Sequence, residues 1–162
     1  MFLSDEVFRS VVASTPLVSI DLVVRRPNGD LLLGQRLNRP ARGFWFVPGG
    51  RIYKNETLDA AFRRITEAEL GVAFERDQAR LLDVYEHFYA DSVFGPAGAG
   101  QPDTHYVVLG YRLDIPDPQR LALPTAQHDA YRWWAPGDIC GNPVVHENSQ
   151  AYLAALGWPS TG

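Results

Sequence analysis

Residues 56–71, with the sequence ETLDAAFRRITEAELG, constrain the fold more than any other segment. Four of their side chains recur at the spacing i, i+4, i+7 and i+11, which places them on one stripe of a helix. The stripe consists of Leu58, Phe62, Ile65 and Glu69. Gly71 is a typical helix stop. We therefore expect a helix that buries an apolar face and carries a carboxylate near its end.

The remaining segments predict more strands than helices. Alternating apolar residues and turn signals indicate strands at residues 17–25, 31–36, 43–50, 81–90, 104–115 and 130–135. Further helices are expected after Ser4, which is a suitable N-cap, and over residues 147–156. Helices at the start, middle and end of a strand-rich chain favour an α/β fold with helices on both faces of the sheet. We expect one domain over residues 1–162, because no segment resembles an interdomain linker.

Composition excludes several classes of protein. The net charge of −4 argues against general attraction to nucleic acids or membranes, so an anionic substrate needs a local basic cluster. The single cysteine, Cys140, excludes an internal disulfide and fits a reducing cytoplasm. Apolar runs stay well below the roughly 20 residues of a membrane span, and the start of the chain does not resemble a signal peptide.

The glycines before the helix allow a second interpretation of Glu69, as a metal ligand instead of a solvent-exposed side chain. A lone Glu69 at a helix end most simply reaches water. However, a strand that enters the turn at Gly49 and Gly50 can bring a backbone carbonyl close to a ligand. A carbonyl together with a carboxylate is oxygen ligation that suits Mg²⁺.

The segment VPGGRIYKNETLDAAFRRITEAELG is similar to the Nudix box, G-x5-E-x7-R-E-U-x-E-E-x-G-U, in which U is an aliphatic residue. The matching positions are Gly50, Glu56, Arg64, Glu69, Gly71 and Val72, whereas Ile65, Thr66 and Ala68 depart from the pattern. This resemblance implies the Nudix fold, an α/β/α sandwich around a mixed sheet. It also implies Mg²⁺-dependent attack on a nucleoside diphosphate linked to another group.

The departures affect the chemistry that is expected. Carboxylates at the positions of Ile65 and Ala68, beside Glu69, hold further metal ions and activate water for attack on phosphorus in ordinary Nudix enzymes. One carboxylate can hold a single Mg²⁺, which neutralises a diphosphate leaving group and permits substitution at carbon. The GDP-mannose mannosyl hydrolase branch shares these departures, and the chain resembles it over nearly its whole length, including the segments WFVPGGR, THYVVLG and QHD-YRW.

The resemblance to this branch implies a role for individual residues. It assigns the metal to the carbonyl of Gly49, the carboxylate of Glu69 and the amide of Gln127. It assigns the general base to His128, and histidine suits that task because its unperturbed pKa is about 6.5. Considered alone, Gln127 and His128 are ordinary loop residues.

Further residues are matched to parts of the substrate. Diphosphate and leaving-group contacts are assigned to Arg36, Arg51, Arg64 and Tyr106. Arginine is suited to forked contacts with phosphate oxygens, although each of these residues is also a candidate for a solvated surface charge.

The sugar is matched to Asp21, which interrupts an apolar strand, with His87 as an assisting group. Asp21 is otherwise an edge residue that points to solvent. The guanine site is matched to Phe2, Leu3 and Phe8, which are otherwise helix-packing residues. The family's N-terminal segment also contributes to a homodimer, so a partner chain is expected to help complete the site.

Three functions are compared on these grounds. The first is hydrolysis of GDP-mannose, or of GDP-glucose, to GDP and free sugar by attack of water at the anomeric carbon with inversion. The second is ordinary Nudix hydrolysis at phosphorus, which Ile65 and Ala68 disfavour. The third is a nucleotide-sugar-binding module without hydrolysis, which the retention of Glu69, Gln127 and His128 disfavours.

Overall fold

The computed structural model describes residues 2–124 and 128–158, and within them the chain forms a mixed sheet with helices on both sides. The strands pair in the order β3-β2-β1-β6-β5, while β4 pairs with β1 and β7 with β2. Their bounds are β1 Leu17–Arg25, β2 Leu31–Arg36, β3 Trp45–Phe46, β4 Gly49–Arg51, β5 Arg80–Tyr89, β6 Thr104–Asp114 and β7 His128–Trp134.

Strand β1 is the centre of this sheet. It runs parallel to β6 and antiparallel to β2 and β4. Its residues Ile20, Leu22, Val23 and Val24 are all fully buried, as expected for a strand that is covered on both faces.

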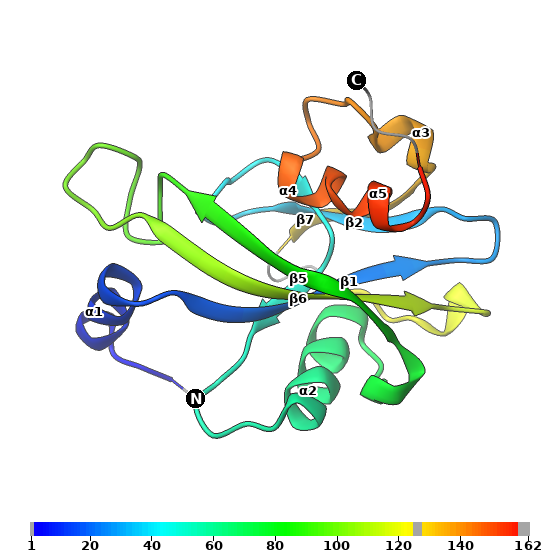
Figure 1. Cartoon of the computed structure of the whole chain (residues 1–162), viewed down its shortest axis with the longest axis horizontal. Coiled ribbons are helices and arrows are strands. Elements are labelled where there is room, and N and C mark those ends of the chain that lie inside the picture. The colour runs from blue at the N-terminus through cyan, green and yellow to red at the C-terminus, as the bar shows by residue number, and fades with distance from the viewer. Residues whose placement is uncertain (1, 125–127, 159–162) are drawn as a thin grey trace.

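The helices form two separate layers (Figure 1). Helix α2 (Leu58–Leu70) covers one face of the sheet, and α3 (Pro136–Ile139), α4 (Glu147–Gln150) and α5 (Tyr152–Ala155) cover the other. Helix α1 (Asp5–Ser14) lies beside one end of the sheet, and short 3-10 turns occupy Arg76–Gln78 and Pro118–Arg120. The expected α/β/α sandwich around a mixed sheet is confirmed.

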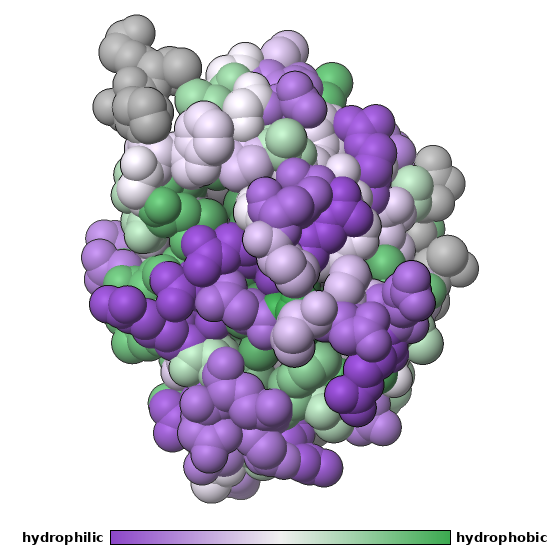
Figure 2. All heavy atoms as spheres, turned by 90° about the vertical axis from the view of Figure 1, so that its right-hand side faces the viewer, coloured by the Kyte–Doolittle hydropathy of each residue, from purple (hydrophilic) through white to green (hydrophobic). Residues whose placement is uncertain are grey.

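Alternation along the strands divides the core between these layers. On β2, Leu32 packs into the α2 side, whereas Leu31 and Leu33 pack into the side of α3 to α5. Figure 2 shows hydrophilic side chains spread over the face it presents, with hydrophobic ones in small patches between them. None of the helices in the described residues is long and apolar enough to cross a membrane.

Helix α2 has a local signal at each end, of which the sequence predicts the stop at Gly71. The Thr57 hydroxyl accepts a hydrogen bond from the backbone N–H of Ala60 at 3.1 Å and caps the helix start. Gly71 ends the helix in the left-handed conformation, with φ 74°. A side chain at Gly71 would collide with the carbonyl of Ala122, whose backbone N–H donates to the Leu70 carbonyl at 2.9 Å. The end of α2 is thus fixed to the segment that leads towards β7.

Two expected elements are divided in the structure. Residues 43–50 form β3 and β4, which pair with β2 and β1 respectively. Between them Pro48 has no N–H for a ladder, but its carbonyl accepts from the Leu22 N–H at 2.8 Å. The helix expected at 147–156 is divided at Ala151 into α4 and α5. For residues 43–50 the local signal is right, and strand pairing fixes where each element ends.

Candidate active site

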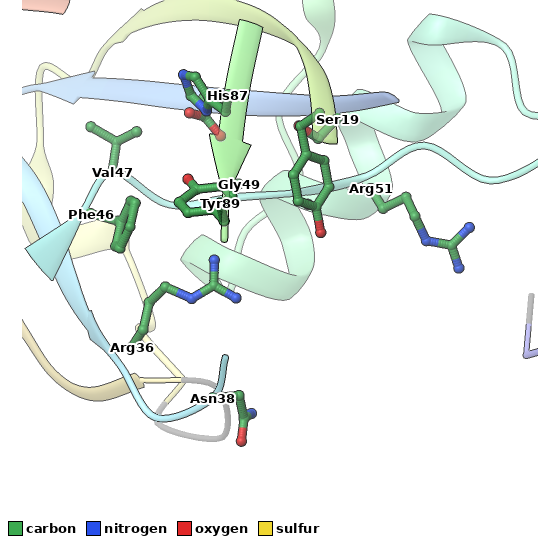
Figure 3. A pocket seen from close by; sticks show the side chains of 12 residues that line it. Ser19, Arg36, Asn38, Phe46, Val47, Gly49, Arg51, His87 and Tyr89 are labelled. Carbon is green, nitrogen blue, oxygen red and sulfur yellow. The ribbon is translucent and has the colours of Figure 1, made fainter. Parts of the chain in front are cut away.

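A cavity of about 330 Å³ opens beside the ends of the central strands (Figure 3). Residues of β1, β2, β4, β5 and β6 contribute to its walls, so the sheet brings together segments that are far apart in sequence. The lining residues are Ser19, Asp21, Arg36, Asn38, Phe46, Val47, Gly49, Gly50, Arg51, His87, Tyr89 and Tyr106. The cavity therefore collects Asp21, Arg36, Arg51, His87 and Tyr106 from the residues that the sequence singles out.

The deep end of the cavity is built around Asp21. This residue stands opposite Gly49 in the β1–β4 pairing. A Cβ atom at Gly49 would lie 2.6 Å from Asp21 Oδ1 and 2.5 Å from the Ile20 carbonyl oxygen, so only glycine fits there. The other carboxylate oxygen, Oδ2, accepts a hydrogen bond from the Tyr152 hydroxyl at 2.6 Å.

Burial raises the pKa of Asp21 to about 7, with a further upward contribution from the negative charge of Glu69. The hydrogen bond from Tyr152 and the positive charge of Arg36 act in the opposite direction. These influences show that the carboxylates of β1 and α2 lie close enough to interact. They also show that Arg36, on β2, reaches towards the same point.

His87 also lies at the deep end. It is only 5% exposed, and burial lowers its pKa to about 4, with help from His146. The ring is therefore neutral at pH 7. His146 stacks on Phe46, with ring centroids 4.7 Å apart, and its Nδ1 caps α4 by accepting from the Asn148 N–H at 3.1 Å.

The mouth of the cavity is positively charged. The guanidinium of Arg36 lies 5.5 Å from the centre of the Phe46 ring, and that of Arg51 lies 5.0 Å from the ring of Phe8. Tyr106 lies near both arginines: burial raises the pKa of its hydroxyl, while the two positive charges act to lower it. Two cations and a phenol at one opening are suitable partners for a diphosphate.

Arg64 has a different position from the other two arginines. Its Nε donates to Glu56 Oε2 at 2.7 Å, and its Nη2 donates to the Arg51 carbonyl at 2.8 Å. Glu56 also accepts from the Tyr53 N–H at 2.7 Å. Thus Arg64 and Glu56 together hold the segment that carries Arg51, and Arg64 is not among the residues that line the cavity.

Glu69 is buried rather than solvated. It is 4% exposed, which contradicts the interpretation of a helix end that reaches water. Burial and the nearby charge of Glu69 together raise the pKa of Tyr131 on β7. One turn earlier on α2, Ile65 packs on the glycine turn, because a Cβ at Gly50 would lie 3.2 Å from its Cγ1. The position where the Nudix pattern has its first metal-binding glutamate is therefore part of the core.

The donors in this region suit a hard cation held by few protein ligands. In the part of the chain that the structure describes, no group of three or more His, Cys, Asp or Glu side chains is placed to share a metal ion. Of the residues that the sequence assigns to a metal, Gly49 lines the cavity and Glu69 is buried on α2; a carbonyl and a carboxylate are oxygen ligands of the kind that Mg²⁺ takes, with water and phosphate as its other ligands. Gln127 lies outside the described residues.

Four predicted site residues remain: His128, Phe8, Leu3 and Phe2. His128 begins β7, where its backbone pairs with that of Arg36, so the two residues are neighbours in the sheet. Phe8 packs edge-on against Phe94 at 5.9 Å and approaches Arg51, which brings α1 to the mouth. Leu3 is half-buried and Phe2 is exposed.

Sequence reasoning missed the C-terminal contribution to this site. Tyr152 and His146 come from segments that supply no lining residue by themselves, yet they contact Asp21 and Phe46 directly. Tyr89, which lies two residues after His87 on β5 and also lines the cavity, was missed as well. The period-2 pattern of β5 is the signal by which Tyr89 could have been found, because it places both side chains on one face.

Comparisons with known proteins agree with this architecture. A family model described as the NUDIX domain matches residues 15–156. The chain is 40% identical over 152 residues to the low-salt glycan biosynthesis protein Agl8 of Haloferax volcanii, covering 94% of this chain and 89% of that protein.

Solved structures give the same result. The MutT NUDIX hydrolase from Burkholderia pseudomallei superposes with a TM-score of 0.68 at 28% identity, covering 88% of this chain and 99% of that one. The NUDIX domain of Shewanella oneidensis NrtR, solved with ADP ribose, shares the fold, with a TM-score of 0.65 at 18% identity and coverage of 95% and 97%. The chain described here belongs to the Nudix hydrolase family.

Proposed function

We propose that this chain hydrolyses GDP-mannose, or a closely related GDP-sugar such as GDP-glucose, to GDP and free sugar. One observation carries the proposal: Glu69 is buried on α2 within electrostatic range of Asp21, while Ile65 packs on Gly50 in the core. The helix that supplies several carboxylates to ordinary Nudix chemistry at phosphorus supplies one here. The name of the relative Agl8, a glycan biosynthesis protein, agrees with a nucleotide-sugar substrate.

The two ends of the cavity suit the two parts of such a substrate. The cations of Arg36 and Arg51, with the hydroxyl of Tyr106, face the diphosphate. The carboxylate of Asp21 and the neutral ring of His87 face the sugar. A carboxylate near the anomeric carbon stabilises the positive charge that develops there in the transition state.

The reaction transfers one oxygen from water to carbon. His128 takes a proton from water, whose oxygen bonds to the anomeric carbon on the face opposite the diphosphate. The bond between that carbon and the diphosphate oxygen breaks, and its electron pair leaves with GDP. The arginines bind the diphosphate in the ground state and in the transition state alike, and Tyr106 donates a hydrogen bond to the leaving group.

The proposed cofactor is Mg²⁺, held by the Gly49 carbonyl, the Glu69 carboxylate and the Gln127 amide. When bound, it neutralises the diphosphate and so improves the leaving group. The other ligands of a six-coordinate Mg²⁺ are then phosphate oxygens and water.

Isotope labelling tests the proposed bond cleavage. The protein is incubated with GDP-mannose and Mg²⁺ in ¹⁸O-water, and both products are analysed by mass spectrometry. We expect GDP without label and mannose with one ¹⁸O atom. Labelled GMP or mannose 1-phosphate would show attack at phosphorus, and binding without turnover would identify a nucleotide-sugar-binding module.

We also propose a homodimer in which the N-terminal segment of a partner chain helps to enclose the guanine. In one chain Phe8 already lies beside Arg51 at the mouth, whereas Phe2 is exposed. Light scattering after gel filtration measures the oligomeric state, and a monomer that binds GDP with full affinity would contradict the proposal.

A further inference from the structure

Tyr152 connects the C-terminal layer to the cavity. The residue is fully buried, and its ring lies edge-on to Tyr85 with centroids 4.7 Å apart. Gly110 on β6 provides the space for it, because a Cβ at that position would lie 2.7 Å from Tyr152 Cε1. β5 and β6 thus fix the ring, and with it the direction of the hydroxyl.

The hydroxyl of Tyr152 distinguishes the two oxygens of Asp21. It donates to Oδ2 at 2.6 Å, whereas Oδ1 lies on the side of Gly49, where an added Cβ atom would come within 2.6 Å of it, and both residues line the cavity. A carboxylate without such a bond rotates freely about its last torsion. One hydrogen bond from a fixed phenol therefore holds the carboxylate plane and leaves one oxygen for a ligand.

We propose that Tyr152 is a positioning residue for the sugar subsite, which holds Asp21 so that Oδ1 faces the anomeric carbon of the substrate. This inference rests on the proposed function for the role of Asp21. Tyr152 acts through Asp21 and does not touch the sugar.

Packing alone does not explain the hydroxyl. A phenylalanine at position 152 would fill the same space between Tyr85 and Gly110. Desolvation makes a carboxylate costly unless several donors satisfy it, and in the part of the chain that the structure describes Tyr152 supplies the one side-chain hydrogen bond to Asp21. A pair that is costly for the fold and points into a cavity fits a functional role better than a structural one.

The test is a double-mutant cycle between Tyr152→Phe and Asp21→Asn, read as kcat and KM for GDP-mannose. Losing a hydrogen bond to a charged group typically changes a rate by about 10–100-fold. We expect Tyr152→Phe to lower kcat by that factor, while KM and the calorimetric affinity for GDP stay within about threefold. In the Asp21→Asn background, the same substitution should change kcat by less than about threefold.

Tyr85→Phe is the matched control, because it removes a hydroxyl from a ring that packs on Tyr152, and its kcat should stay within about twofold of wild type. An unchanged kcat in Tyr152→Phe, or an equal loss in both backgrounds, would overturn the inference. If Tyr152→Phe does not fold, 3-fluorotyrosine incorporated at position 152 retains the ring and strengthens the donor. A kcat that differs from wild type then supports the inference, and an identical kcat contradicts it.

Failure of the proposed function is distinguishable from failure of this inference. Attack at phosphorus in ¹⁸O-water by the wild-type protein overturns the function, and the cycle then still measures the link between Tyr152 and Asp21 through kcat. If the wild type binds GDP-mannose without turnover, calorimetry decides. A weaker affinity for GDP-mannose in Tyr152→Phe, with unchanged affinity for GDP, supports positioning; equal changes for both ligands overturn it.

Discussion

The deep end and the mouth of the cavity are organised in opposite ways. At the deep end, Asp21 is half-buried and His87 is buried, and burial favours the neutral form of each, because it raises the pKa of Asp21 and lowers the pKa of His87. At the mouth, the guanidinium groups of Arg36 and Arg51 lie over aromatic rings and face the opening. The deep end is held in place before a ligand arrives, whereas the mouth presents charge to it.

This difference separates two kinds of contribution. A rigid, desolvated group stabilises charge that develops during the reaction, which changes kcat. A solvent-accessible cation contributes to binding in the ground state as well as in the transition state, which changes KM. The predictions below test this separation, beginning with the largest expected effect.

The general base should have the largest effect of all. His128→Gln retains polarity and approximate size but cannot take a proton at neutral pH, so kcat should fall by about 10²–10⁴-fold, with a much smaller change in KM. In the wild type, kcat should also fall as the pH drops through the histidine pKa in the complex, and the variant should lack that limb.

A His128→Gln variant with the full rate and the same acid limb would identify another base. An acid limb near pH 4 would indicate His87, because burial lowers its pKa to about 4.

Glu69→Gln should lower kcat by roughly two to three decades, the usual effect of losing one metal-stabilised charge interaction. The side chain is buried but nearly isosteric with glutamine, so circular dichroism should show an unchanged fold. Titration with Mg²⁺ should show a weaker affinity for the metal, so that a higher Mg²⁺ concentration is needed for half of the maximal rate. Near-normal turnover that depends on Mg²⁺ would remove Glu69 from the metal site.

Asp21→Asn should raise the free energy of unfolding of the metal-free protein above pH 7 by ~1–4 kcal/mol, although it lowers kcat. The folded-state pKa of about 7 exceeds the model value of 3.8, so wild-type stability should fall as the pH rises from about 4 to 7. Denaturant titrations at several pH values measure this trend.

His87 contributes with the opposite sign, because its folded pKa of about 4 is below 6.5, and its contribution is lost as the pH falls through that range. The wild type and the Asp21→Asn variant both contain His87, so the difference between their curves of unfolding free energy against pH isolates the contribution of Asp21. Equal stability of the two proteins at pH 5 and pH 8 would show that Asp21 is not penalised by burial.

Arg51→Met should have the smallest effect of the series. It keeps contact with the Phe8 ring but removes the charge, so KM and the dissociation constant for GDP should rise by about tenfold. Arg63→Met is the matched control, because Arg63 pairs with Glu75 on the exposed side of α2, and it should change neither value. A large loss of kcat at constant KM would abolish the distinction between mouth and deep end.

The parts of the fold that the sequence predicts are those whose signals are local to one segment. Helix α2 follows from the stripe that contains Phe62 and Ile65 and from the stop at Gly71, both within one segment. The strands follow equally from alternation and turns. The split of residues 43–50 into β3 and β4 does not, because it depends on which strands are available as partners.

Long-range contacts explain what the sequence does not predict in the site. Asp21 appears in the sequence as an interruption in a strand, but its partner Tyr152 lies 131 residues away in a helix without any distinguishing signal. In the same way, His146 looks like a loop residue until α4 brings it onto Phe46. The resemblance to the Nudix family assigned functional roles to residues that local sequence patterns alone do not identify as site residues.

The contact between Gly71 and Ala122 has a consequence for how this scaffold can diversify. Ala122 is bound to the Leu70 carbonyl, and the backbone of His128 pairs with that of Arg36, so residues 122 and 128 are both anchored to neighbouring elements. Changes between such anchors are tolerated best where they spare Leu123, which packs against the α2 side of the core. New substrate preferences can therefore be sought, by selection or by design, in libraries of this short segment, provided that Gly71, Leu123 and the proposed metal ligand Gln127 are kept.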